Sequence, residues 1–328
     1  MAVAAQEVAL ALADGRDVDE SWLTPAGDAG RGGQGTVHRL AGHPGLLFKR
    51  YLEPAKVYGA ALGDLVRVRL DRSPSERELL DAQAAWPLCR VVDAGRCVGF
   101  LMHEAPDTMR WQPASGGRRL TELQHLFYPE RPATRGVLRP DPEQRLALVL
   151  ELAALVGRLH RWGLVFGDLS QANVLWSVSP APAVHLIDCD SARRAGAPPV
   201  LAQAETPNWQ DPLTPHGSSA TVDSDRYKAA LIIGRALAQD PYLTPGQPLD
   251  PLPGVLTERG LAAVRRTWEL AAGPYGSRPD LTAWLTALDG RGTIPLRAAA
   301  APVRRPVAEH LFDTRTARGS IPLRRPSP

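Results

Sequence analysis

The sequence predicts an α+β protein, and three observations support this class. Short apolar segments of strand length occupy much of residues 23–106, broken by turns rich in glycine. Residues from Asp141 onward instead carry apolar side chains at helical spacing. The hydrophobic fraction of 44% and the mean hydropathy of −0.19 are ordinary values for a globular chain with a substantial core.

The amino-terminal half begins with an extension, residues 1–22, in which a short helix or strand is expected. The segment "GDAGRGGQGTVHRL" predicts a glycine-rich turn before a strand, and "GLLFKRYL" predicts the next strand. A helix should follow in "SPSERELLDAQAAW", because an N-cap serine opens it and Pro87 ends it. Two strands, "RVVDAG" and "CVGFLMHE", complete this half.

The carboxyl-terminal half should be mainly helical. Residues 107–141 are rich in Pro, Arg and Gly and predict a long surface excursion. A helix is expected from Asp141 to Gly163, followed by short strands in "NVLW" and "VHLID". Further helices are expected at about 224–239, 258–271 and 280–288.

The last segment, residues 291–328, predicts a disordered basic tail rich in Pro and Arg. Eight arginines face one Glu and one Asp there, whereas residues 1–290 carry a net charge of −3. The net charge of +3 therefore gives no indication of a nucleic-acid-binding face. Two similar peptides, "GTIPLR" (292–297) and "GSIPLR" (319–324), reflect either low-complexity drift or a duplicated peptide that binds a partner.

Cellular location is expected to be cytoplasmic. The three cysteines form neither a disulfide framework nor a metal-binding cluster, which suits a reducing compartment. The amino terminus lacks the basic start of a signal peptide. The longest apolar stretch contains Glu151 and Arg158 and is too short to span a bilayer, so no membrane partner is expected.

The glycines between residues 30 and 35 form a G-x-G-x-x-G pattern, with Gly33 inside it and Val37 two residues beyond Gly35. Such a turn can offer backbone N–H donors to phosphate groups, although an ordinary flexible turn has the same composition. A dinucleotide-binding turn would lead into a helix, whereas a strand is expected here, which argues against that alternative.

Lys49 lies in the predicted strand "LLFKRYL" and is one of only three lysines among 38 basic residues. A strand lysine with apolar neighbours can direct its ammonium group at nucleotide phosphates if a carboxylate holds it. Glu76 and Glu78, in the next predicted helix, compete for that role. Glu78 is preferred, because a helix that turns Glu78 toward Lys49 also places Leu79, Ala82 and Ala85 on one packing face. The alternative is that both glutamates are exposed to solvent and neither holds Lys49.

Asp168, Asn173 and Asp188 form the third group of interest. Asp168 and Asn173 lie in "VFGDLSQANVLW", and Asp188 ends "HLID". A hairpin of the two strands between them would bring their oxygen atoms to one edge. Asn and Asp oxygens suit Mg²⁺, and the remaining Asp could orient or deprotonate a hydroxyl group. The alternative is that these residues only form turns.

Taken in order, these segments resemble a divergent bacterial protein kinase of the eukaryotic-like (Hanks) type over residues 28–288. "GRGGQGTV" is similar to the glycine-rich loop, "FKRY" to the lysine strand, "LHRWGLVFGDLSQANVL" to the catalytic loop and "LIDCD" to the metal-binding segment. "TPNWQDP", "DSDRYKAALIIGRAL" and "GSRPDLTAWL" resemble later kinase motifs. The arginine-rich composition also fits a bacterial genome of high GC content.

The resemblance implies a bilobal kinase-like fold. Residues 23–106 would form a lobe with an antiparallel sheet and one main helix, ending in a hinge. Residues 107–290 would form a mostly α-helical lobe that includes the 107–141 insertion. It also implies that Asp225 anchors the catalytic loop backbone and that Arg278 pairs with Asp211.

The resemblance further implies ATP and Mg²⁺ as cofactors. Asp168 would act on the substrate hydroxyl, with Lys49, Glu78 and Ser170 also in the catalytic set. Asn173 and Asp188 would hold the metal ion. The nucleotide would contact a larger set: Gly30, Gly32, Gly33, Gly35, Val37, Lys49, His103, Glu104 and Ala105.

Several residues depart from the family pattern. Phe166 and Gly167 replace the usual His-Arg before Asp168, which removes the arginine that normally pairs with a phosphorylated activation loop. Ser170 replaces a lysine, as in RIO-type kinases. Cys189 and Asp190 replace the Phe-Gly that follows the metal-binding Asp; Cys189 is either an inert buried thiol or a reactive one beside the nucleotide.

Three functions remain open from the sequence. The preferred one is an active Ser/Thr protein kinase that modifies protein substrates, itself included, in bacterial signalling. The second is a nucleotide-binding pseudokinase or scaffold, with partner binding through residues 292–324. The third is a small-molecule kinase, against which the apparent activation segment weighs.

Overall fold

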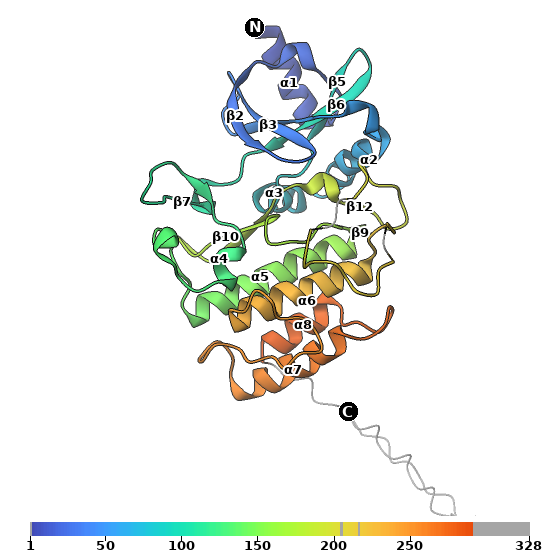
Figure 1. Cartoon of the computed structure of the whole chain (residues 1–328). Coiled ribbons are helices and arrows are strands. Elements are labelled where there is room, and N and C mark those ends of the chain that lie inside the picture. Colours follow the sequence, from blue (N-terminus) through green and yellow to red (C-terminus); the bar gives the residue numbers. More distant parts are fainter. Residues whose placement is uncertain (1, 204–205, 216, 291–328) are drawn as a thin grey trace, which may run out of the picture. The chain divides into compact units, whose positions relative to one another are not determined.

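The computed structural model describes residues 2–203, 206–215 and 217–290 and has a mixed α+β architecture, as the sequence predicts (Figure 1). A β-sheet with helices forms the amino-terminal part, and the three longest of the described helices lie in the chain that follows it. The predicted tail, 291–328, which contains both of the similar peptides, lies outside the described residues.

The main sheet has six strands in the order β1-β5-β6-β4-β3-β2. All neighbouring strands are antiparallel except β1 and β5, which are parallel. Its central strands, β4 and β6, are buried on both faces over most of their length. The strands are β1 (Val18–Asp19), β2 (Pro25–Arg31), β3 (Gly35–Leu40), β4 (Leu46–Tyr51), β5 (Cys89–Asp93) and β6 (Arg96–His103).

The N-terminal extension folds onto this sheet. Helix α1 (Ala2–Asp14) places Val8 and Ala11 in a buried cluster with Phe48 and Leu101. The expected short helix ahead of the first strand is therefore present, and it covers one face of the sheet (Figure 1).

Two helices follow β4, whereas the sequence pattern predicts only the second. Helix α2 (Gly59–Leu70) escapes prediction because its apolar residues are mixed with Arg67 and Arg69. Helix α3 (Pro74–Gln83) begins with the expected Ser73 cap, reinforced by the Glu76 side chain. The Trp86 indole then donates a hydrogen bond to the Leu65 carbonyl (2.9 Å), which ties the end of α3 to α2.

The segment 107–141 is not the surface excursion that its composition suggested. It contains β7 (Arg110–Trp111), β8 (Arg119–Leu120) and the short helix α4 (Gln124–Phe127). Trp111, Leu126 and Phe127 are buried in the main core, so apolar anchors spaced along a polar segment fix it to the protein.

Four further helices lie in the described part of residues 142–290. The first, α5, begins with an acidic turn and ends just before Gly163, as expected. The second, α6, is buried along nearly its whole length. A glycine in α6, Gly234, allows the Trp268 ring of α7 to approach, since a Cβ atom there would lie 2.4 Å from the ring. The helices are α5 (Pro142–Arg161), α6 (Val222–Ala238), α7 (Glu258–Ala271) and α8 (Leu281–Leu288).

Two small two-stranded sheets lie between α5 and α6. The predicted hairpin is present as β10 (Val174–Ser177) and β11 (Ala183–Leu186). The second sheet pairs β9 (Leu164–Val165) with β12 (Arg193–Arg194). The chain after β9 carries Asp168, and the chain after β11 carries Asp188, so these two sheets position both carboxylates.

His185 joins β11 to the end of α3 and should make stability sensitive to acid. Its ring is fully buried, and Nδ1 donates a hydrogen bond to the Ala82 carbonyl (3.0 Å). Burial lowers the His185 pKa from 6.5 to about 4, although the bond to Ala82 opposes this shift. The unfolded chain therefore takes up a proton that the folded protein resists between pH 6.5 and about 4.

We predict that this histidine costs about 3 kcal/mol of folding stability as the pH falls from 7 to 4. Denaturant unfolding at several pH values should show a shallower loss of stability in His185→Asn than in the wild type. His43→Asn, in the partly exposed turn before β4, is the control and should leave the pH dependence unchanged. An equal pH slope for wild type and His185→Asn would contradict the prediction.

Candidate functional site

A cavity of about 410 Å³ lies between the main sheet and the loops that follow β9 and β11. Most of the residues selected from the sequence line it. They include the glycine-rich turn, the buried lysine of β4, the chain end of β6 and the two loop carboxylates. Those that do are Gly30, Gly32, Gly33, Gly35, Val37, Lys49, His103, Ala105, Asp168 and Asp188.

The glycine-rich turn connects β2 to β3 on one wall of this cavity. At Gly35 a Cβ atom would lie 2.6 Å from the Arg50 carbonyl oxygen, so only glycine allows β4 to approach this closely. Gly30, Gly32 and Gly33 have open space around their Cα atoms instead. The backbone of the turn is therefore accessible to a ligand in the cavity, as a phosphate-binding turn requires.

Lys49 points from β4 toward the loop after β11. It is 4% exposed, and its Nζ atom donates to Asp190 Oδ1 at 2.7 Å and to Asp188 Oδ1 at 3.3 Å. Burial disfavours its charge, but the Asp190 and Asp188 carboxylates outweigh this effect and raise the Lys49 pKa above its usual value. The ammonium group therefore stays protonated.

Asp190 is the main partner of Lys49 and is itself buried. Its second oxygen accepts a hydrogen bond from the Tyr51 hydroxyl at 3.0 Å, from the same strand as Lys49. Burial and the nearby Asp190 charge raise the Tyr51 pKa well above its usual value, so Tyr51 remains a donor. One carboxylate thus holds two side chains of β4.

The prediction that Glu78 holds Lys49 is wrong. Glu78 is exposed on α3, and Leu79 is exposed beside it, because α3 buries the face that carries Leu80. The competing residue, Glu76, is also engaged elsewhere, since its carboxylate accepts hydrogen bonds from the backbone and side chain of Ser73.

The loop after β9 places Asp168 at the cavity. Asn173 Nδ2 donates to the Asp168 carbonyl (2.8 Å) and to Asp168 Oδ2 (2.7 Å). The Thr206 hydroxyl donates to the other carboxylate oxygen at 3.1 Å. Asp168 is therefore fixed on two sides, and one of its oxygens already accepts a hydrogen bond from a hydroxyl group.

Asp225, at the start of α6, fixes the backbone of the same loop. Its fully buried carboxylate accepts hydrogen bonds from the amides of Phe166 (2.6 Å) and Gly167 (2.9 Å). His160 Nε2 lies 3.3 Å from the same carboxylate. The anchoring role that the resemblance implied for Asp225 is confirmed.

Asp188 has the oxygen chemistry and the exposure that a metal ligand needs. Its side chain is half exposed to the cavity, and its backbone is left-handed at φ 53°, an unusual conformation for a residue other than glycine. Its neighbour Ile187 donates its amide to the Asn173 carbonyl at 3.0 Å. In the part of the chain that the structure describes, no three His, Cys, Asp or Glu residues form a metal cluster. Asp188 and Asn173 thus fit a cation only if ligand oxygens complete its shell.

Four predicted site residues do not line the cavity. Asn173 is buried behind Asp168, and Glu78 faces solvent. Ser170 is 1% exposed, and its hydroxyl has no hydrogen-bond partner among the described residues. Glu104 instead accepts hydrogen bonds from Arg39 (2.9 Å) and from Arg110 (2.8 Å), which itself lines the cavity.

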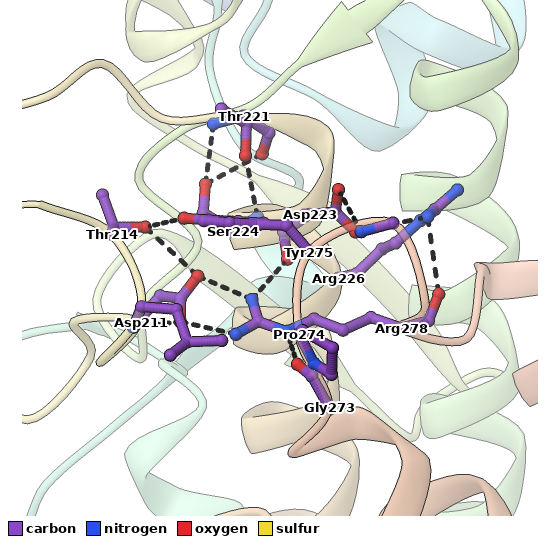
Figure 2. A network of polar contacts seen from close by, with 12 residues as sticks. Asp211, Thr214, Thr221, Asp223, Ser224, Arg226, Gly273, Pro274, Tyr275 and Arg278 are labelled. Carbon is purple, nitrogen blue, oxygen red and sulfur yellow. Dashed lines mark hydrogen bonds and ion pairs between the residues drawn. The ribbon is translucent and has the colours of Figure 1, made fainter.

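Arg278 and Asp211 form the buried pair that the resemblance implied. Figure 2 shows the guanidinium group facing the carboxylate, with Nη1 and Nη2 donating to Asp211 at 2.6 and 2.8 Å. Asp211 also accepts hydrogen bonds from the amide of Leu213 and the hydroxyl of Thr214. The pair therefore holds the segment before α6 against the segment before α8.

Four residues at the site were not predicted: Asp190 as the partner of Lys49, together with Tyr51, Thr206 and Gln203. Asp190 carried a usable signal, because "DCD" places two carboxylates at alternate positions. Thr206 opens "TPNWQDP", which resembles a kinase motif, but the contact of its side chain with Asp168 was not predicted. Gln203 carried no signal, since it comes from an irregular segment whose path no periodicity predicts.

We predict that removing the Asp190 charge costs far more stability than removing the Glu78 charge. Asp190→Asn should lower the unfolding free energy by about 3 kcal/mol, because it leaves a buried ammonium with only the weaker Asp188 contact. Glu78→Gln, at an exposed position, should change it by less than about 0.5 kcal/mol. Denaturant unfolding measures both; equal effects would show that Lys49 does not depend on Asp190.

No protein-family model matches the chain, and no curated protein matches it in sequence. Among the helices described, none combines the length and the apolar character needed to cross a membrane. The functional conclusion therefore depends on the chemistry of the cavity.

Proposed function

We propose that the chain is an ATP- and Mg²⁺-dependent protein kinase, which transfers the γ-phosphate to Ser or Thr hydroxyls of proteins, itself included, and that its fold is the bilobal kinase type. One observation carries this proposal: a glycine-rich turn, a buried lysine and two loop carboxylates line a single cavity. Each component alone is compatible with a purely structural role, but their convergence fits phosphoryl transfer.

The sheet side of the cavity would bind the nucleotide. The open backbone around Gly30 and Gly33 can approach phosphate oxygens, whereas the Gly32 amide donates to the Gly35 carbonyl (2.9 Å) in the described structure. The Lys49 ammonium group supplies positive charge. His103 and Ala105, at the end of β6, would border the adenine ring. Glu104 contributes its backbone at most, because its side chain does not line the cavity and is engaged by Arg39 and Arg110.

Asp188 and Asn173 would hold Mg²⁺, which would neutralise phosphate charge when it is bound. Asn173 donates to Asp168 in the described arrangement, and Asp188 contacts Lys49. Asp188 Oδ1 can exchange the lysine for a cation, whereas Asn173 would bind a cation through its amide oxygen, because its contact with Asp168 is made by Nδ2.

Asp168 would orient the substrate hydroxyl. The hydroxyl oxygen forms a bond to the γ-phosphorus, the bond from that phosphorus to the bridging oxygen breaks, and ADP leaves. The hydroxyl proton passes to Asp168, whose carboxylate accepts a hydrogen bond from the Thr206 hydroxyl in the described structure. Ser170 cannot take the charge-neutralising part of a lysine, so that part rests with Lys49 and the metal ion.

A nucleotide-binding pseudokinase or scaffold is the second candidate. Two contacts favour it: Lys49 closes on the would-be metal ligand Asp188, and Asn173 is occupied by Asp168. A third candidate, a small-molecule kinase, shares the same cavity chemistry and differs only in the acceptor.

We predict that folded wild-type protein transfers labelled phosphate from ATP–Mg²⁺ to itself or to a protein substrate. Asp168→Asn should lower kcat by about 10²- to 10⁴-fold while it still binds ATP, because the nucleotide contacts lie elsewhere. Asp188→Asn should abolish transfer, and ATP binding by this variant should no longer depend on Mg²⁺. Radiolabel incorporation and calorimetric ATP binding measure these effects.

Glu78→Gln is the matched control for these variants, because its carboxylate is exposed and outside the cavity. ATP binding without any transfer by folded wild type would support the scaffold. Transfer to a hydroxylated metabolite but to no protein would support the third candidate.

A further inference from the structure

Gln203 joins three separate segments through one side chain. Its Nε2 atom donates to the Gly167 carbonyl (2.7 Å), in the loop that carries Asp168. Its Oε1 atom accepts hydrogen bonds from Arg193 Nη1 (3.2 Å) and from the amide of Ala220 (3.3 Å). The same carboxamide therefore connects the Asp168 loop, β12 and the turn before α6.

Arg193 is a buried cation whose partners are neutral. It is 3% exposed, and its Nη2 atom donates to the Ala220 carbonyl at 2.6 Å. No ion pair of Arg193 occurs within residues 2–203, 206–215 and 217–290, although the charge of Asp225 acts on it from a longer distance. The Gln203 side-chain oxygen thus gives the buried Arg193 guanidinium group a hydrogen-bond acceptor, a role that a carboxylate or another anion could also fill.

A second buried cation reaches the same carbonyl as Gln203. Lys228 of α6 is 6% exposed, and its Nζ atom donates to the Gly167 carbonyl at 2.6 Å. The Gly167 carbonyl accepts from two donors, and its amide donates to Asp225. The peptide units next to Asp168 are therefore held by contacts within the protein at both their donor and their acceptor atoms.

Gly167 and Gln203 fit each other sterically. The φ angle of Gly167 is 84°, a value that residues with side chains rarely adopt. A Cβ atom there would lie 3.0 Å from Gln203 Nε2 and 3.2 Å from the Ser191 carbonyl oxygen. The glycine that replaces the expected arginine thus makes room for the glutamine.

We propose that Gln203 is a positioning residue that holds the Asp168 loop in its working arrangement without a phosphate group on the segment between β12 and α6. This inference rests on the proposed kinase function for its kinetic consequence. It goes beyond that function by assigning the contact made in place of the lost arginine and its phosphorylated partner. Gln203 acts through Gly167 and Arg193, and its effect on Asp168 is indirect.

We predict that Gln203→Ala lowers kcat about tenfold and leaves the KM for ATP within about twofold, because the Gly167 carbonyl next to Asp168 loses one of its two donors while Lys49 and the glycine-rich turn are unchanged. Gln203→Glu should retain intermediate activity, since a carboxylate can accept from Arg193 but cannot donate to Gly167 while ionised. The exposed Gln112→Ala is the matched control. A normal kcat in Gln203→Ala, or a raised KM alone, would overturn the proposal; the second result would mark a ligand contact.

Hydrogen exchange tests the same contact without any assay of transfer. In Gln203→Ala the Ala220 amide loses its acceptor, so peptides covering 217–222 should exchange faster, whereas peptides of α7 should not. Unchanged exchange would contradict the positioning role even if the wild type proves inactive. Faster exchange in a protein without transfer activity would instead count against the proposed function alone.

Phosphatase treatment tests whether a phosphate is dispensable. Wild-type protein that mass spectrometry shows to be unmodified between residues 191 and 221 should keep its full kcat. Activity that appears only after phosphorylation in that segment would overturn the proposal.

Discussion

The buried contact between Lys49 and Asp190 is the interaction on which the site depends. It joins the main sheet to the loop after β11 across the cavity, at 2.7 Å between two side chains that are each almost fully buried. Such a pair stabilises a fold only when its remaining hydrogen-bonding groups are satisfied. Tyr51 and Asp188 meet that condition here, because each bonds to one member of the pair.

Lys49 is therefore held by the loop after β11 and not by α3, which reaches the site instead at His103, whose Nε2 atom lies 3.9 Å from Asp81 Oδ2. Asp81, one of the three acidic residues of α3, forms a bidentate pair with Arg69 of α2, at 2.6 and 2.7 Å, so the two helices hold each other. Because Lys49 takes its carboxylate from the β11 loop, its position does not require a movement of α3. The cavity is therefore assembled from the sheet and two loops that Asp225 and Asp190 already fix.

The sequence was sufficient for features that depend on local pattern. The α+β class, the helix cap at Ser73, the start of a helix at Asp141 and the β10–β11 hairpin all follow from periodicity and turn chemistry. The partner of Lys49 does not, because which carboxylate lies within 3 Å depends on how α3 rotates, and the burial of Leu80 decides that rotation. The prediction of a surface excursion for segment 107–141 was wrong for a similar reason. A few buried apolar side chains fix the segment to the protein, although most of its residues are polar.

The two carboxylates of "DCD", Asp188 and Asp190, contact Lys49 differently because they differ in burial. Asp190 is buried and keeps its contact, whereas Asp188 is half exposed and makes the longer contact of 3.3 Å. Under the proposed function, a bound cation would draw Asp188 away from the lysine. Lys49 would then retain Asp190 and gain a free donor for phosphate oxygens. Two carboxylates only two residues apart would thus have different roles: Asp190 would keep its contact with Lys49, and Asp188 would release the lysine to bind the cation.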